Sequence, residues 1–262
     1  MSGGPQAKKR FGQHFLHDPG VIERILRAVD PQPGEALVEI GPGPGALTAP
    51  LLRRWPGVLT VVELDREVLP WLREACGEQA ERLQVIEADA LQLDYRRLAP
   101  EGQPLRLIGN LPYNISTPLL FHLLEQSPAI RDMHFMLQKE VVDRMVAAPG
   151  EAAYGRLSVA MAARAELAWL LDVGPGAFKP PPRVQSAVVR IRPRAPAFAV
   201  ADWAAFDRVL AQAFSQRRKT LSNALRGLLD ATRIEQAGVD PGARAETLDA
   251  AAYARLAAQI AV

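Results

Sequence analysis

The sequence of 262 residues predicts an α/β protein: a mostly parallel sheet with an antiparallel edge hairpin, followed by a small helical domain. Three observations predict this. Short apolar runs alternate with segments of helical periodicity, which is typical of βαβ units. A glycine-rich turn, Gly41–Gly45, lies between the first such run and the next helix. Beyond Pro193–Pro196 only helical patterns remain, so we expect a domain boundary there.

The first helix is expected to begin at Asp18-Pro19, because Asp caps helices and Pro suits the first turn. Its apolar stripe is Val21, Ile22, Ile25, Leu26 and Val29. The runs that we expect to be strands are Ala36–Ile40, Val58–Val62, Leu83–Ile86, Leu105–Ile108 and His134–Leu137. The helices expected between and after them are Leu47–Arg54, Arg66–Cys76, Thr117–Glu125 and Lys139–Ala147.

Two later runs, Leu167–Val173 and Ser186–Ile191, flank the proline-rich Phe178–Arg183 and predict the antiparallel edge hairpin. The C-terminal helices are expected at Trp203–Ser215, Leu221–Leu229, Thr232–Ala237 and Leu248–Ile260. We therefore expect a larger domain, 1–194, and a small all-helical domain, 195–262.

Composition excludes several classes of protein. With 48% hydrophobic and 23% charged residues, the chain can bury a large core. Cys76 is the only cysteine, so the chain has no internal disulfide and no cysteine-based zinc site. The four histidines lack metal-site spacing, and we expect no metal. The chain shows neither an apolar signal core nor a run long enough to span a bilayer, so we expect a cytoplasmic protein without a membrane partner.

The net charge of +2 does not by itself indicate a nucleic-acid partner, but its distribution is uneven. A basic run is usually a solvated surface. The candidate RNA contacts are Lys8, Lys9 and Arg10 near the start, and Arg217, Arg218 and Lys219 in the C-terminal part.

The glycine loop offers a backbone that can turn tightly and approach a ligand closely at Gly41 and Gly43. A nicotinamide-dinucleotide fingerprint also fits this spacing. However, Pro42 and Pro44 remove backbone donors that a pyrophosphate needs. Glu39, just before the loop, instead suits a ligand that carries ammonium and sulfonium charges.

Carboxylates follow the next two strands. Glu63 lies 22 residues after Gly41, where a carboxylate can accept from both ribose hydroxyls. Asp89 can accept from an adenine amine while the backbone N–H of Ala90 donates to the ring. A helix cap is the simpler interpretation for Asp65. Carboxylates at the ends of consecutive strands nevertheless indicate one shared crevice.

The tetrapeptide Asn110–Tyr113 follows the fourth strand. An adenine amine is a poor nucleophile because its lone pair is delocalised. The side-chain oxygen of Asn110 and the carbonyl of Leu111 can accept its two N–H bonds and favour a nucleophilic geometry. Tyr113 can stack on an unstacked base, and Phe178 is a candidate for the other face. A strand-ending turn and a core aromatic are the alternatives for these two features.

These motifs do not stand alone. Alongside the glycine loop, the relevant segments are Arg10–Leu16, Glu63–Asp65, Asp89–Ala90, Gly109–Ser116, Met133–Glu140, Tyr154–Ser158, Phe178–Ser186 and Gln216–Thr220. Together they closely resemble the KsgA family, the 16S ribosomal RNA adenine N6,N6-dimethyltransferases. The resemblance runs from about Arg10 to the C-terminal helices.

The resemblance implies a Rossmann-like class I methyltransferase fold with S-adenosyl-L-methionine as the cofactor. It implies dimethylation of N6 of two adjacent adenosines in the 3′-terminal hairpin loop of 16S rRNA, within a small-subunit assembly intermediate. We expect the enzyme to act as a monomer. The implied cofactor contacts are His14, Leu16, Gly41, Glu63, Asp89 and Asn110, to which the loop and strand arguments add Gly43 and Ala90.

The resemblance also implies that Asn110, Leu111 and Tyr113 position the amine, that Phe178 holds the base, and that Arg217, Arg218 and Lys219 face rRNA. The domain 1–194 would then carry the active site, and the small helical domain 195–262 would bind RNA. One departure is His14, where many relatives have Asn. Imidazole can still form a hydrogen bond at this position.

Three other functions remain possible on these residues: a 23S rRNA dimethyltransferase of the macrolide-resistance type, a non-catalytic ribosome assembly factor, and a DNA adenine methyltransferase. The form of Gly109–Ser116 and Gln138–Glu140 favours the 16S enzyme. The intact Asn110–Tyr113 motif argues against a loss of activity, and no extra target-recognition domain is evident for DNA.

Overall fold

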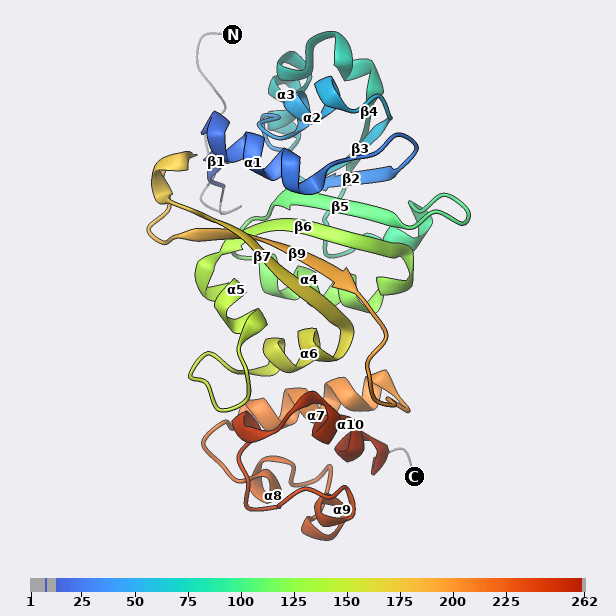
Figure 1. Ribbon diagram of the computed structural model, residues 1–262, viewed down its shortest axis with the longest axis vertical. Helices are drawn as coiled ribbons and strands as arrows, with labels where there is room; N and C mark the ends of the chain where they lie inside the picture. The colour runs from blue at the N-terminus through green and yellow to red at the C-terminus, as the bar shows by residue number, and fades with distance from the viewer. Residues whose placement is uncertain (1–7, 9–12, 261–262) are drawn as a thin grey trace. The chain divides into compact units, whose positions relative to one another are not determined.

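The computed structural model describes residue 8 and residues 13–260, and it divides into two compact units (Figure 1). The first comprises Met1–Val142 and Leu167–Pro193, and the second comprises Asp143–Glu166 and Arg194–Val262. The second segment of the second unit begins at Arg194, close to the predicted boundary. The second unit also contains the segment Asp143–Glu166, which the sequence analysis had placed in the larger domain.

The first unit is built on a seven-stranded sheet with the order β4-β3-β2-β5-β6-β9-β7 (Figure 1). Its strands are β2 (Ala36–Ile40), β3 (Leu59–Glu63), β4 (Leu83–Glu87), β5 (Leu105–Asn110), β6 (Ile130–Gln138), β7 (Ala165–Val173) and β9 (Ser186–Pro193). The β2–β3, β3–β4, β2–β5 and β5–β6 pairs are parallel, whereas β9 runs antiparallel to β6. The prediction of a mostly parallel sheet with an antiparallel edge is confirmed.

The order of the strands fixes where a ligand can bind. Successive strands run outward from β2 in one direction through β3 and β4, and in the other through β5 and β6. In open α/β sheets the crevice at such a reversal, at the carboxyl ends of the strands, is the usual ligand site. The site is therefore expected beyond Ile40, Glu63 and Asn110.

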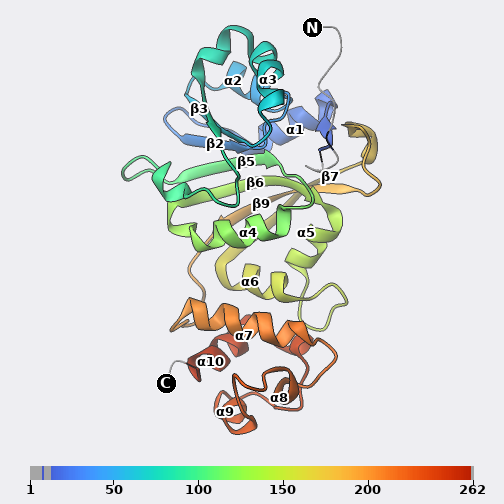
Figure 2. The same ribbon diagram turned by 180° about the vertical axis from the view of Figure 1, so that it is seen from behind.

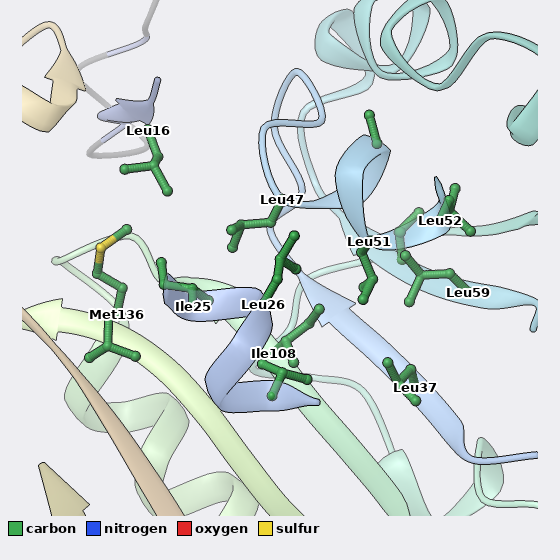
Figure 3. Close-up of a cluster of buried hydrophobic side chains, with 14 of the residues drawn as sticks. Leu16, Ile25, Leu26, Leu37, Leu47, Leu51, Leu52, Leu59, Ile108 and Met136 are labelled. Atoms are coloured by element: carbon green, nitrogen blue, oxygen red, sulfur yellow. The ribbon is translucent and has the colours of Figure 1, made fainter. Parts of the chain in front are cut away.

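Helices cover both faces of this sheet (Figures 1 and 2). Helix α1 (Pro19–Val29) is capped by the Asp18 carboxylate, which accepts from two backbone amides. Its Ile25 and Leu26 pack into a buried cluster with Leu37 and Ile108 of the sheet (Figure 3). Helix α4 (Ser116–Glu125) covers the opposite face.

The remaining helices of this unit are α2 (Thr48–Arg54), α3 (Leu69–Cys76) and the start of α5 (Lys139–Val146). The single helix predicted for Arg66–Cys76 is divided into a 3₁₀ turn at Arg66–Val68 and α3. Asp65 caps this turn by accepting from the backbone N–H of Glu67, which agrees with the helix cap expected from the sequence.

Two very short strands, which the sequence analysis did not predict, form a separate ladder. β1 (Phe15–Leu16) pairs antiparallel with β8 (Phe178–Lys179), and the backbone N–H of His17 donates to the carbonyl of Ala177. This ladder joins the start of the chain to the proline-rich loop.

The second unit is helical. Its helices are α6 (Arg156–Arg164), α7 (Trp203–Ser215), α8 (Leu221–Ala224), α9 (Ala231–Gln236) and α10 (Ala250–Ala258). The segment before β7 belongs here because its side chains bind this unit: Arg164 pairs with Asp207 at 2.7 Å, and the Tyr154 hydroxyl donates to the carbonyl of Leu248 at 2.6 Å. Within the described ranges, no helix has the length and apolar content that crossing a membrane requires.

Candidate active site

A cavity of about 300 Å³ opens at the carboxyl ends of β2, β3 and β5, where the strand order reverses. Ten of the predicted site residues line it: His14, Leu16, Gly41, Gly43, Glu63, Asp89, Ala90, Asn110, Leu111 and Tyr113. Residues that are far apart in the sequence therefore meet at one pocket. Gln13, Phe15 and Pro112 also line it, and each lies inside a motif that the sequence analysis quoted.

The glycine loop forms the floor of the pocket beside β2. The backbone N–H of Gly41 donates to the carbonyl of Val62 at 2.9 Å, which ties the loop to β3. Gly43 has φ +53°, and a Cβ atom there would lie 3.3 Å from the ring of Phe15. The left-handed backbone favours glycine here, and the ring of Phe15 would have to shift slightly to admit a Cβ atom.

The carboxylate of Glu63 is 8% exposed and is held by backbone amides. Its oxygens accept from the N–H groups of Gly43 at 3.2 Å and Asp65 at 2.8 Å. Burial raises the pKa of the Glu63 carboxyl, and these hydrogen bonds offset part of that increase. The arrangement fixes a strong hydrogen-bond acceptor at the wall of the pocket.

Glu39 lies deeper, 1% exposed, where the hydroxyl of Thr48 donates to its carboxyl oxygen at 2.7 Å. Burial raises the pKa of Glu39 to about 7, and the nearby carboxyl of Glu63 acts in the same direction. Two carboxyl groups thus line one pocket, and an organic cation entering it would favour their ionised forms.

Asp89 and Ala90 lie in the turn after β4. One oxygen of the Asp89 side chain accepts from the backbone N–H of Leu91 at 2.9 Å, which fixes the carboxylate at the rim. Ala90 is buried, and its carbonyl accepts from the Tyr95 hydroxyl at 3.2 Å. The turn is therefore held rigidly against the pocket.

The amide of Asn110, at the end of β5, has a defined orientation. Its Nδ2 donates to the backbone carbonyl of His14 at 2.9 Å, so the side-chain oxygen is left as the acceptor on the pocket side. The next residue, Leu111, donates its backbone N–H to the carbonyl of Met136 at 3.1 Å. Pro112 then fixes the direction of the Leu111 carbonyl.

Tyr113 is held from two sides. Its hydroxyl shares a 2.6 Å hydrogen bond with the hydroxyl of Ser186, and its ring stacks on that of His14 with centroids 5.4 Å apart. Burial raises the pKa of the phenol, so it stays protonated near neutral pH. The imidazole of His14 donates through Nδ1 to the carbonyl of Pro180 at 2.8 Å, so both rings are fixed.

Phe178 does not line the pocket. It is 2% exposed and packs in the buried cluster with Leu16, its partner in the β1–β8 ladder. The side chain packs in the core, and the contact of Phe178 with the base stays a prediction. By pairing with Leu16 it holds the β1 segment, including His14, against the rim.

The predicted RNA-contacting residues are dispersed. Lys8 pairs with Asp65 at 2.7 Å and with Glu67 at 2.9 Å in the first unit. Lys9 and Arg10 lie outside the described residues. In the second unit Arg217 pairs with Glu246 at 2.6 Å, whereas Arg218 and Lys219 are exposed.

No group of three or more histidine, cysteine, aspartate or glutamate side chains gathers at metal-binding distance in the part of the chain that the structure describes. The carboxyl groups that line the pocket are those of Glu39, Glu63 and Asp89.

Comparison with known proteins decides the family. Residues 4–261 match the family model described as ribosomal RNA adenine dimethylase. The chain belongs to this family. The protein is therefore an rRNA adenine dimethyltransferase. The resemblance to the KsgA family is confirmed.

Curated relatives of this dimethylase span nearly its whole length. Ribosomal RNA small subunit methyltransferase A from Acidithiobacillus ferrooxidans is 54% identical over 256 residues, covering 97% of this chain and 95% of the relative. The protein of the same name from Pseudomonas aeruginosa is 52% identical over 257 residues, covering 98% and 95%.

Solved structures agree with the fold of the dimethylase. A dimethyladenosine transferase from Plasmodium falciparum matches with a TM-score of 0.75 and 25% identity, covering 93% of this chain and 96% of that one. The 23S rRNA methyltransferase ErmE matches with a TM-score of 0.69 and 26% identity, covering 95% and 100%. The fold is that of the class I S-adenosylmethionine methyltransferases.

Proposed function

We propose that this dimethylase transfers methyl groups from S-adenosylmethionine to N6 of two adjacent adenosines in the 3′-terminal hairpin loop of 16S rRNA, in the cytoplasm, on an assembling small subunit. Relatives that are more than half identical carry the name of a small-subunit rRNA methyltransferase, which supports this substrate. The observation that carries the chemistry is the orientation of the Asn110 amide at the rim of the pocket.

The residues of the pocket suit the donor. Glu63 presents a buried, rigidly held carboxylate for the ribose hydroxyls. Asp89 and the backbone of Ala90 suit an adenine edge, and Gly41 and Gly43 allow close approach to the backbone. When bound, S-adenosylmethionine supplies a methyl group on a positively charged sulfur, which suits a pocket lined by carboxyl groups.

Asn110 and Leu111 act on the target amine. Because Asn110 Nδ2 is committed to the carbonyl of His14, its oxygen can accept one N–H of the amine, and the Leu111 carbonyl can accept the other. These two bonds draw the nitrogen lone pair out of conjugation and toward the pocket. The stacking of Tyr113 on the base fixes the plane in which the amine lies.

The second unit offers positive charge for the RNA backbone. Lys219 and Arg226 line a polar hollow together with Gln212, Gln216 and Asn223. Cations and amide groups are the side chains that contact phosphate oxygens. The hollow supports our proposal that this unit binds rRNA through Lys219 and Arg226, and Arg218 is exposed next to Lys219 in the sequence.

The experiment is methyl transfer from labelled S-adenosylmethionine to small subunits isolated from cells that lack the modification. The expected product is dimethyladenosine at the two adjacent positions. An Asn110→Ala variant should lower the rate constant of transfer by about 10²-fold or more, because it removes an acceptor that acts in the transition state. It should still bind small subunits, because Asn110 is not among the residues that we propose bind rRNA.

The likeness to ErmE makes a 23S rRNA enzyme the second candidate. The matched experiment measures methyl transfer to purified large subunits that lack the corresponding modification. Labelling of large subunits alone would overturn the small-subunit proposal and leave the adenine chemistry intact. An unchanged transfer rate for Asn110→Ala would overturn the chemistry itself.

A further inference from the structure

Ser186 is buried at the start of β9, and its exposed fraction is 0%. Its Oγ lies 2.6 Å from the Tyr113 hydroxyl, and in the described part of the chain that phenol is its hydrogen-bond partner. A buried hydroxyl without a partner is unfavourable. The serine therefore holds the far end of the phenol ring in place.

The bond spans the width of one strand. Asn110 at the end of β5 pairs with Met136 of β6, and Ser186 of β9 pairs with Gln138 of the same strand. Tyr113 thus reaches from the loop after β5, past the end of β6, to the first residue of β9. The position of its ring is fixed by the sheet and not by its own loop alone.

The two contacts on Tyr113 constrain different degrees of freedom. The hydrogen bond to Ser186 fixes the axis from Cβ to the hydroxyl, and the stacked ring of His14, at an interplanar angle of 29°, limits rotation about that axis. A stacking platform must be fixed in both respects, because tilting it would tilt the base and move its amine away from the Asn110 oxygen.

We infer that Ser186 is a positioning residue for methyl transfer: its hydroxyl pins the Tyr113 ring in the plane on which the target adenine stacks. The inference rests on the proposed stacking role of Tyr113. It adds a residue outside the Asn110–Tyr113 motif to the machinery that orients the base, and it gives the hydroxyl of Tyr113 a purpose that stacking alone does not require.

The test is a double-mutant cycle on methyl transfer to unmodified small subunits. Ser186→Ala and Tyr113→Phe each remove one half of the same hydrogen bond and leave an aromatic ring for stacking. Each should lower kcat by about 3- to 10-fold, which corresponds to the loss of one hydrogen bond. The double variant should be no slower than the slower single variant, since the bond can be removed only once.

Two further readouts separate positioning from a general structural role. The affinity of each variant for S-adenosylmethionine, measured by titration calorimetry, should equal that of the wild type, because neither side chain is among the residues assigned to the donor. Ser158→Ala removes a buried serine hydroxyl that donates to the carbonyl of Arg144 in the second unit. It should leave kcat unchanged.

Additive effects of Ser186→Ala and Tyr113→Phe, or an unchanged kcat for Ser186→Ala, would overturn the inference. Tyr113→Ala distinguishes this failure from that of the proposed function. If Tyr113→Ala slows transfer strongly while Ser186→Ala does not, only the positioning role is wrong. If Tyr113→Ala is as active as the wild type, the stacking role and the inference built on it both fall.

Discussion

Glu39 shows how one buried side chain ties the pH dependence of stability to the pocket. Burial raises its pKa from 4.5 to about 7, so the folded protein holds this proton more tightly than the unfolded chain does. The resulting stabilisation is complete below pH 4.5 and is lost as the pH rises through about 7. The difference amounts to on the order of 3 kcal/mol.

A Glu39→Gln variant keeps the size and the acceptor of the side chain but removes the titration. We expect the free energy of unfolding of Glu39→Gln to rise relative to that of the wild type between pH 5 and pH 8, by up to ~3 kcal/mol. Urea denaturation at a series of pH values measures it. Any constant cost of the amide cancels in the comparison between pH values.

Glu78→Gln, at an exposed position, is the control and should run parallel to the wild type at every pH. A constant difference between Glu39→Gln and the wild type would show that Glu39 is ionised in the folded protein throughout this range.

At this scale the sequence identifies residues whose chemistry is local. Glu63 and Asn110 follow their strands directly, so strand ends alone place them at the crevice. The contacts of His14 and Tyr113 could not be predicted, because their partners Pro180 and Ser186 are more than 70 residues away. The burial of Phe178 could not be predicted for the same reason, because its place beside Leu16 depends on the β1–β8 pairing.

Among the elements, the end of α1 depends on a side chain from β5. The guanidinium of Arg106 donates to the carbonyl of Val29 at 2.7 Å and pairs with Glu35 at 2.6 Å and Asp132 at 3.0 Å. Burial raises the pKa of Asp132, but the guanidinium and the imidazole of His134 outweigh it and bring the value to about 2. This ion cluster joins α1, β5 and β6.

Removing Arg106 takes the arginine partner from the buried carboxylate of Asp132 and one of two arginine partners from Glu35. We expect Arg106→Met to lower the free energy of unfolding at pH 7 by about 3–5 kcal/mol. Urea denaturation monitored by circular dichroism measures this. Because the pKa of Asp132 is depressed, its contribution is present above pH 3.8 and is lost as the pH falls through about 2, so wild type and variant should converge in acid.

Arg131 provides a matched control, since it pairs with the same Glu35 but is 54% exposed. Arg131→Met should cost less than about 1 kcal/mol. Equal losses for the two variants would contradict the view that burial makes the Arg106 cluster important.

Element boundaries were predicted best where periodicity and caps agree. Helices α1 and α7 fall close to their expected ranges because Asp18 and Asp202 cap them. Helix α6, rich in alanine and without a side-chain cap, was not predicted. The helix expected at Leu221–Leu229 ends as α8 at Ala224, and Gly227 beyond it has φ +86°, which is unsuited to a helix.

On the scale of the whole molecule, the pocket that contains Asn110 belongs to the first unit and the polar hollow around Lys219 belongs to the second. The sequence predicted a division near residue 194, but it did not predict that Asp143–Glu166 belongs to the second unit. The placement of this segment depends on pairs such as Arg164–Asp207. These residues are 43 positions apart, so no local sequence pattern indicates that they pair.

This division predicts that RNA affinity and chemistry can be separated. We expect the double substitution Arg218→Gln with Lys219→Gln to weaken binding to small subunits and to reduce the slope of log K against log salt by about 0.7–0.9 for each phosphate that is no longer neutralised. Filter binding at several salt concentrations measures it. The rate of methyl transfer at saturating subunit concentration should stay that of the wild type.

Arg233→Gln, an exposed arginine of α9 outside that hollow, is the control and should keep the wild-type slope. An unchanged slope for the Arg218 and Lys219 variant would place the RNA contacts elsewhere.

The position of β9 between β6 and β7 has a consequence for the synthesis of this protein. While the nascent chain is shorter than about 193 residues, β6 has an unpaired edge, which is prone to pair with other chains. The rim of the pocket also closes late, because β1 pairs with Phe178–Lys179. Translation must therefore pass β8 and β9 before the enzyme acquires a completed binding site, and chains that end before these strands will lack one.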